Sequence, residues 1–213
     1  TAEKITHDKI KKNIYYKNAT LNILDFPVFY FPNFFHPDPS VDRRSGLLQP
    51  RLNKSNIVGT SITQPYYKVI SNNKDYTFKP TIFDDRIYMF HNEYRQKNIN
   101  SSFIADFGYT KGYKSSNSNN RNSMSHLFSK ANIDLDYDNY TNSKIDIFVE
   151  KVSMDTYLKI FEDILITDKS LEDDLKDHNT LTSGIKLSLD NEKFNFTSGI
   201  TSYENLQKSK NDR

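Results

Sequence analysis

Apolar and polar residues alternate along most of the chain that follows residue 74. In the stretch RIYMFHNEYRQK, for example, Tyr88, Phe90 and Tyr94 alternate with His91 and Glu93. A period of two predicts a β-strand with one apolar face and one polar face. Counting two stretches with weaker alternation, the pattern predicts nine strands, over residues 45–54, 57–70, 75–83, 86–97, 101–111, 126–137, 143–151, 180–190 and 192–203.

These strands fit two classes of all-β protein. A soluble β-sandwich has the same pair of faces on each strand. An antiparallel transmembrane β-barrel is favoured by strands of about ten residues, by aromatic side chains near their ends and by charges that suit a wet lumen. In a barrel, the side chains expected to face the lumen are Lys79, Glu93, Arg95, Asp106, Lys130 and Asp134. Those expected to face lipid are Phe103, Phe107, Tyr109, Leu127, Ile133, Leu135, Ile145 and Ile147.

The connections between the predicted strands alternate in character. One set is short and polar, at 71–74, 97–100, near 140 and at 190–192. The other set has two short members, near 55 and 84, and two long ones, at 112–123 and 153–179. Outer-membrane barrels have short periplasmic turns and longer outer loops, so we expect the long connections to lie outside the cell. Within the second of them, Tyr157, Ile160, Phe161, Ile164 and Leu165 fall at helical spacing and predict a short helix.

The first 45 residues do not continue this pattern. The stretch IYYKNATLNILDFPVFYFP is typical of the last strands of a separate β domain, and the run from Asp25 to Pro50 holds five prolines and six aromatic residues. Because proline lacks a ladder donor, we do not expect a regular sheet in that run. Nine is also an odd number of strands, whereas a closed barrel formed by one bacterial chain has an even number of strands. We therefore expect the end of a β domain at 1–35, a connector at 36–45 and the front strands of a longer barrel at 46–213.

Composition excludes several classes of protein. The net charge of +2 gives no electrostatic reason to expect nucleic acid. Cysteine is absent, so this stretch can form neither a disulfide nor a thiolate metal site. It contains no apolar run long enough for a transmembrane helix. The start, TAEKITHDKI, lacks both Met and an apolar signal region, and we interpret it as a cut point.

The sequence offers little catalytic chemistry. The five histidines, at 7, 36, 91, 126 and 178, have no metal-ligand spacing, so we expect no metal site and no cofactor. His91 is expected to be a hydrogen-bonded side chain at the lumen surface. The chain has no G-x-S-x-G motif and its carboxylates are scattered, which argues against an enzyme. Glu93 and Arg95 share one side of a strand and should form cross-strand ion pairs.

Four short motifs in order carry a resemblance to a known family. They are PVFY at 27–30 with Pro32, DRRSGLL at 42–48 with Pro50, QPYY at 64–67, and EYR at 93–95. Together, over roughly residues 14–97, they resemble the LptD (organic solvent tolerance) family of lipopolysaccharide-assembly outer-membrane proteins. Lys68 departs from that pattern, because it stands where the family has Trp.

The resemblance implies a periplasmic β-jellyroll that leads into an outer-membrane barrel. It implies transport of lipopolysaccharide to the outer leaflet, without covalent chemistry. Acyl chains would follow a jellyroll groove and sugars the barrel lumen. The implied partners are an LptE-like lipoprotein plug and a periplasmic LptA-like bridge protein. The rivals are another outer-membrane barrel, such as a porin or siderophore receptor, which does not need the proline-rich entry segment, and a soluble β-sandwich binding module.

The resemblance also gives roles to single residues. The junction between jellyroll and barrel would comprise Pro27, Pro32, Asp42, Arg43, Arg44 and Gly46. Its two arginines would lie near phosphorylated headgroups, which guanidinium groups bind well, and its glycine would permit a bend. Pro50 and Pro65 lie inside the first two predicted strands and cannot donate to a ladder. They are expected to weaken the seam at which the barrel opens sideways as a lateral gate. The alternative is that each proline stands at a position where the strand ladder needs no N–H donor.

Overall fold

The computed structural model is all-β with antiparallel sheets, and its larger sheet is open rather than closed, as the predicted fold class requires. It describes residues 1–23, 26–41, 43–84, 86–114, 120–162, 165 and 179–207. The chain divides into two compact units, Thr1–Gly46 and Leu47–Arg213. No helix in these described ranges is long and apolar enough to cross a membrane.

The first unit is a three-stranded sheet in the order β1–β2–β3. Its strands are β1 (Ala2–Asp8), β2 (Asn13–Ile23) and β3 (Phe26–Pro37). Aromatic rings pair across β2 and β3: the centroids of Tyr15 and Phe35 are 5.8 Å apart, and those of Tyr16 and Phe34 are 5.9 Å apart. Such pairs stabilise neighbouring strands beyond the area that they bury.

Part of the proline-rich run forms a regular strand, so the expectation of no sheet was wrong for residues 26–37. β3 contains Pro27, Pro32 and Pro37. Among the described residues β3 pairs only with β2, so it is an edge strand of this sheet. Proline is tolerated in an edge strand because its missing N–H can point away from the ladder.

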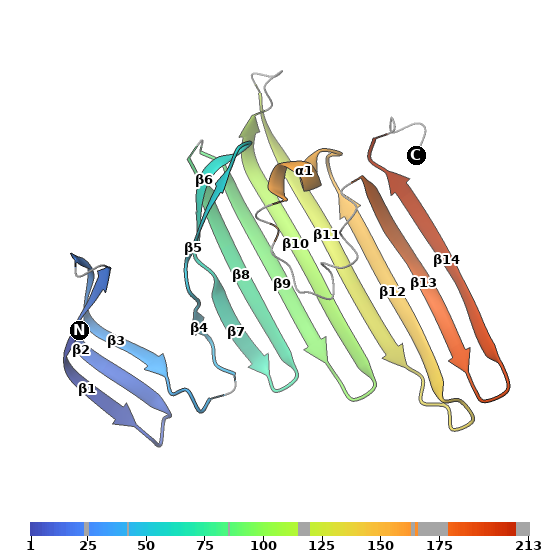
Figure 1. The fold of residues 1–213 in the computed structure, drawn as a ribbon, viewed down its shortest axis with the longest axis horizontal. Helices are drawn as coiled ribbons and strands as arrows, with labels where there is room; N and C mark the ends of the chain where they lie inside the picture. Colours follow the sequence, from blue (N-terminus) through green and yellow to red (C-terminus); the bar gives the residue numbers. More distant parts are fainter. Residues whose placement is uncertain are drawn as a thin grey trace. The chain divides into compact units, whose positions relative to one another are not determined.

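The larger sheet has 11 antiparallel strands (Figure 1). Its order is β14–β13–β12–β11–β10–β9–β8–β6–β5, and β7 pairs with both β8 and β4. The strands are β4 (Gly46–Leu47), β5 (Arg51–Ser55), β6 (Gly59–Thr63), β7 (Tyr66–Ser71), β8 (Lys74–Phe83), β9 (Tyr88–Lys97), β10 (Ser101–Lys114), β11 (Arg121–Asp134), β12 (Asn142–Val152), β13 (Thr180–Asp190) and β14 (Asn195–Asn205). All nine predicted strands are present, and each of the first two is split into two shorter strands.

The connections alternate between the two ends of the sheet, as the sequence predicts (Figure 1). The predicted long connection at 112–123 is shorter than expected, because strand occupies residues 112–114 and 121–123 at its two ends. β10 continues to Lys114, and β11 begins at Arg121. The ladder continues because a β-bulge at Gly112, whose φ is +96°, absorbs a register shift.

The predicted short helix is present as α1 (Tyr157–Phe161). Four of its five residues, Tyr157, Leu158, Ile160 and Phe161, are buried. Much of the predicted connection 153–179, namely residues 163, 164 and 166–178, lies outside the described residues.

The larger sheet has two different faces. We call the face on which α1 packs the helix face, and the opposite one the open face. On the open face, apolar side chains of β8 to β11, β13 and β14 are 40–77% exposed, among them Ile82, Phe90, Phe107, Leu127, Ile185 and Ile200. On the helix face, α1 covers a buried apolar core whose members include Phe83, Met89, Ile104, Met124 and Phe128. The predicted alternation therefore separates the two faces.

Candidate functional site

A buried group of three polar side chains forms where β9, β10 and β11 lie side by side on the helix face. Gly108 of β10 pairs with His91 of β9 on one side and with His126 of β11 on the other. Asp106 lies two residues along β10, so its side chain points to the same face. Strand pairing therefore brings together three residues that are 15 and 20 positions apart in the sequence.

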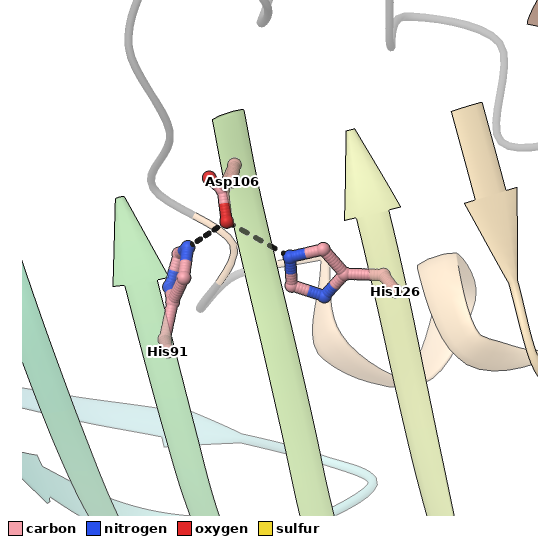
Figure 2. A group of neighbouring side chains, drawn as sticks. All are labelled: His91, Asp106 and His126. Atoms are coloured by element: carbon pink, nitrogen blue, oxygen red, sulfur yellow. Dashed lines mark hydrogen bonds and ion pairs between the residues drawn. The ribbon is translucent and has the colours of Figure 1, made fainter. Parts of the chain in front are cut away.

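The two imidazole rings reach the same carboxylate oxygen. His91 Nε2 lies 2.5 Å and His126 Nε2 2.9 Å from Oδ1 of Asp106 (Figure 2). A carboxylate only accepts hydrogen bonds, so each ring donates through Nε2–H. The three side chains are almost completely buried, with exposed fractions of 2%, 0% and 1% for His91, Asp106 and His126.

α1 closes the group from the side away from the sheet. The hydroxyl of Tyr157 lies 2.7 Å from Nδ1 of His126. Burial raises the pKa of Tyr157 well above its usual range, so this hydroxyl keeps its proton and donates to Nδ1. The chain of contacts therefore runs from Asp106 through His126 to the helix.

Gly108 makes room for this arrangement. A Cβ built on Gly108 would lie 2.2 Å from Cε1 and 2.6 Å from Nδ1 of His126, and 3.1 Å from the hydroxyl oxygen of Tyr157. No real side chain fits at those distances. The glycine leaves the hollow over β10 into which the His126 ring and the Tyr157 hydroxyl reach.

Sequence reasoning did not find this group. His91 was expected at the lumen surface, but it is buried, because α1 and the neighbouring strands cover this part of the helix face. The spacing of the ligand atoms is set by strand register, and no short motif encodes it. The only sequence signal was that His91, Asp106 and His126 all fall on the polar side of their strands.

An ionic network continues from this group along β8 and β9 toward the short turns. Lys79 Nζ lies 2.8 Å from Oε2 of Glu93. Arg95 Nε lies 2.8 Å from Oδ1 of Asp75 and 3.7 Å from Oε1 of Glu93. The predicted cross-strand charges are therefore paired on the helix face, where the partly buried carboxylates need compensation.

The other two predicted lumen residues lie on β11. Lys130 lines an open cavity of about 400 Å³ on the helix face, together with Lys144, Asp146 and Lys186. Asp134 ends β11, is exposed, and pairs in register with Lys144 of β12. The structure thus brings Lys79, Glu93 and Arg95 together on β8 and β9, whereas Lys130 and Asp134 lie on β11.

The predicted junction residues have varied surroundings. Pro27 and Pro32 are exposed in β3, and Asp42 lies outside the described residues. Arg43 is exposed, whereas one Arg44 Nη donates to the carbonyl oxygens of Lys11 and Lys12, each at 3.1 Å. These contacts tie the connector to the turn after β1.

Gly46 begins β4 without needing to be a glycine. A Cβ at this position would meet nothing within 4 Å, and its φ is not positive. The proposed bend therefore does not explain this residue.

Pro50 and Pro65 fall in the two strand breaks. Residues 48–50 separate β4 from β5, and residues 64–65 separate β6 from β7. Across the breaks, Leu48 N donates to the Pro65 carbonyl oxygen at 2.9 Å, and Gln64 Nε2 donates to the Leu48 carbonyl oxygen at 2.8 Å. A side-chain amide thus supplies a bond at the point where the backbone ladder is interrupted.

No protein-family model matches the chain. Curated proteins do match it. The LPS-assembly protein LptD of Polaromonas sp. is 44% identical over 68 residues, which are 32% of this chain and 8% of that protein. The protein of the same name from Pseudomonas aeruginosa is 35% identical over 94 residues, 43% of this chain and 10% of that protein.

A third relative agrees with these two. LPS-assembly protein LptD of Aeromonas salmonicida is 41% identical over 78 residues, 37% of this chain and 10% of that protein. The aligned residues therefore span only about a tenth of the length of these relatives. Because matches from several genera carry the same description, the chain is LptD-like over the part that they align.

Proposed function

We propose that this chain is part of an outer-membrane translocon that places lipopolysaccharide in the outer leaflet. It would comprise the end of a periplasmic β-jellyroll and the first strands of the barrel. The observation that carries the proposal is the similarity to LPS-assembly proteins LptD from three genera. The protein would move its cargo without making or breaking covalent bonds, so it would not be an enzyme.

The open face supports a membrane location. Soluble proteins rarely leave a large contiguous apolar surface uncovered. Here Ile82, Phe107 and Ile185, on strands across the sheet, are 54%, 45% and 45% exposed. In lipid the same surface needs no cover, and we assign the open face to the hydrocarbon of the outer membrane.

The helix face suits the polar half of the cargo. Lipopolysaccharide combines acyl chains with phosphorylated sugars, which need water, hydroxyls and charges along their path. The ion pairs of Lys79 and Arg95 and the cavity beside Lys130 and Lys186 offer such a surface. Arg43 is exposed, and its guanidinium group has the geometry to bind a headgroup phosphate.

The first strands suit a lateral gate. In a closed barrel the first strand pairs with the last, and an unpaired backbone group in lipid costs several kcal/mol. β5 has only five residues, and among the described strands it pairs only with β6. The breaks at Pro50 and Pro65 leave this part of the barrel with few backbone hydrogen bonds between strands. The strands can therefore separate and let a lipid pass between them.

Loss of the protein tests the proposed function. In the source bacterium, depletion of the full-length protein that contains this chain should stop newly made lipopolysaccharide from reaching the cell surface. Pulse-labelled lipopolysaccharide is measured in separated membranes, together with its modification by an outer-leaflet enzyme. Normal surface delivery combined with loss of a solute's uptake would contradict the proposal and favour a porin or receptor.

The proposal also predicts which ends of the strands face the periplasm and which face the outside of the cell. The jellyroll end would lie in the periplasm, where an LptA-like bridge delivers cargo, and an LptE-like lipoprotein would occupy the lumen. An epitope inserted between Lys114 and Arg121 should then be labelled on intact cells, whereas one inserted at Asn73 should need permeabilisation. The reverse pattern would invert the topology. The expected loop at 112–123 includes residues 115–119, which lie outside the described residues.

A further inference from the structure

We propose that His91, Asp106 and His126 form a binding site for a divalent transition-metal ion of the zinc class. This inference does not rest on the proposed transport function. One ligand atom from each residue can be chosen so that all three atoms lie within 4.8 Å of one another. Two imidazole nitrogens and a carboxylate oxygen are ligands that Zn²⁺ takes in proteins, and the set leaves a further coordination position for water.

The burial of Asp106 points to a cation. Its side chain is 0% exposed, and its second carboxylate oxygen, Oδ2, has no hydrogen-bond partner among the described residues. A buried carboxylate with an unsatisfied oxygen is costly unless a positive charge lies nearby. Both imidazole rings reach Oδ1, so Oδ2 is left without a partner among the described residues. A bound divalent ion would compensate the carboxylate and could also use the second oxygen.

The surroundings hold the ligands as a metal site requires. A metal-bound imidazole is usually oriented by a hydrogen bond at its other nitrogen. The Tyr157 hydroxyl lies 2.7 Å from Nδ1 of His126 and occupies that position. Metal binding to Nε2 would move the imidazole proton to Nδ1, which then donates to the phenol oxygen. Gly108 leaves space for the His126 ring.

Such an ion would join separate parts of the fold. Its ligands come from β9, β10 and β11, and Tyr157 would couple it to α1. The ion would therefore fasten the helix to the wall of the sheet. Removing it should loosen α1 more than the strands themselves.

Metal content tests the site directly. The full-length protein that contains this chain is purified in detergent, stripped with a chelator, incubated with Zn²⁺ and dialysed. Wild-type protein should retain about one equivalent of Zn²⁺ more than the His91→Gln and His126→Gln variants. His36→Gln, which changes a histidine of the first unit, is the matched control and should retain as much as wild type. Co²⁺ in place of Zn²⁺ should give wild type a visible absorption band that both site variants lack.

Tyr157→Phe separates a metal site from a hydrogen-bonded cluster. Loss of the orienting hydroxyl should weaken Zn²⁺ affinity roughly 10- to 100-fold, the usual effect of removing such a partner. Equal Zn²⁺ retention by wild type and all variants would overturn the site and leave a hydrogen-bonded cluster only. The Co²⁺ spectrum of wild type needs no variant, so its absence would also overturn the proposal if a substitution prevented folding.

Discussion

Replacing Pro50 and Pro65 together with threonine should sharply reduce delivery of lipopolysaccharide to the cell surface while the barrel still assembles. Each threonine restores a backbone N–H in a strand break, and threonine is a good strand former. A backbone hydrogen bond contributes about 1 kcal/mol net. Two added bonds should then lower the open fraction of the gate on the order of 30-fold.

The measurement is surface lipopolysaccharide in cells that rely on the full-length double variant. Pro80→Thr is the matched control, because Pro80 lies in β8, one strand farther from the edge, and its carbonyl oxygen accepts from Gln64 N at 3.2 Å. The control should deliver lipopolysaccharide normally. Normal delivery by a correctly assembled double variant would contradict the lateral gate. Pro50 and Pro65 would then be irregularities that the strands tolerate.

Arginine on the open face should destabilise the protein according to its depth. Leu127 lies midway along β11, is 40% exposed, and pairs with Phe107. Leu127→Arg should lower the free energy of unfolding in a bilayer by about 2–4 kcal/mol, since arginine at mid-depth faces hydrocarbon. Ile133→Arg, near the end of the same strand, should cost only about 0–1 kcal/mol.

A substitution on the other side of β11 provides the control. Lys130 lies on the helix face, so Lys130→Arg should leave the free energy of unfolding almost unchanged. Denaturant unfolding of the full-length protein in lipid vesicles gives all three values. Equal costs for Leu127→Arg and Ile133→Arg would mean that the open face does not meet a bilayer, and a protein partner would have to cover it.

Strand content was predictable because the period of two survives through long strands. Tyr88, Phe90, His91 and Glu93 already separate the two faces in the sequence, and β9 keeps that separation. The connection expected at 112–123 was predicted too long, because a Ser- and Asn-rich composition is typical of loops, whereas the paired backbone continues through a bulge at Gly112. A regular sheet through Pro32 was not expected, because only the sheet order reveals that β3 is an edge strand.

The contacts within the histidine group could not be predicted from the sequence. His91, Asp106 and His126 meet only because Gly108 is paired with both histidines, and a slip by one residue would turn a side chain to the other face. Register depends on the whole sheet rather than on a local motif. The contact with Tyr157 is harder still to foresee, since it comes from a helix that returns across the sheet.

The packing of α1 gives the helix face two different electrical environments. Along β9, Arg95 and Glu93 lie among ion pairs, whereas Met89 lies in the apolar core beneath α1. The effective dielectric constant therefore falls from the short-turn end toward the helix, and the energy of an unpaired charge rises in the same direction. A phosphate at this surface would therefore be more stable among the ion pairs near the short turns than beside the apolar core under α1.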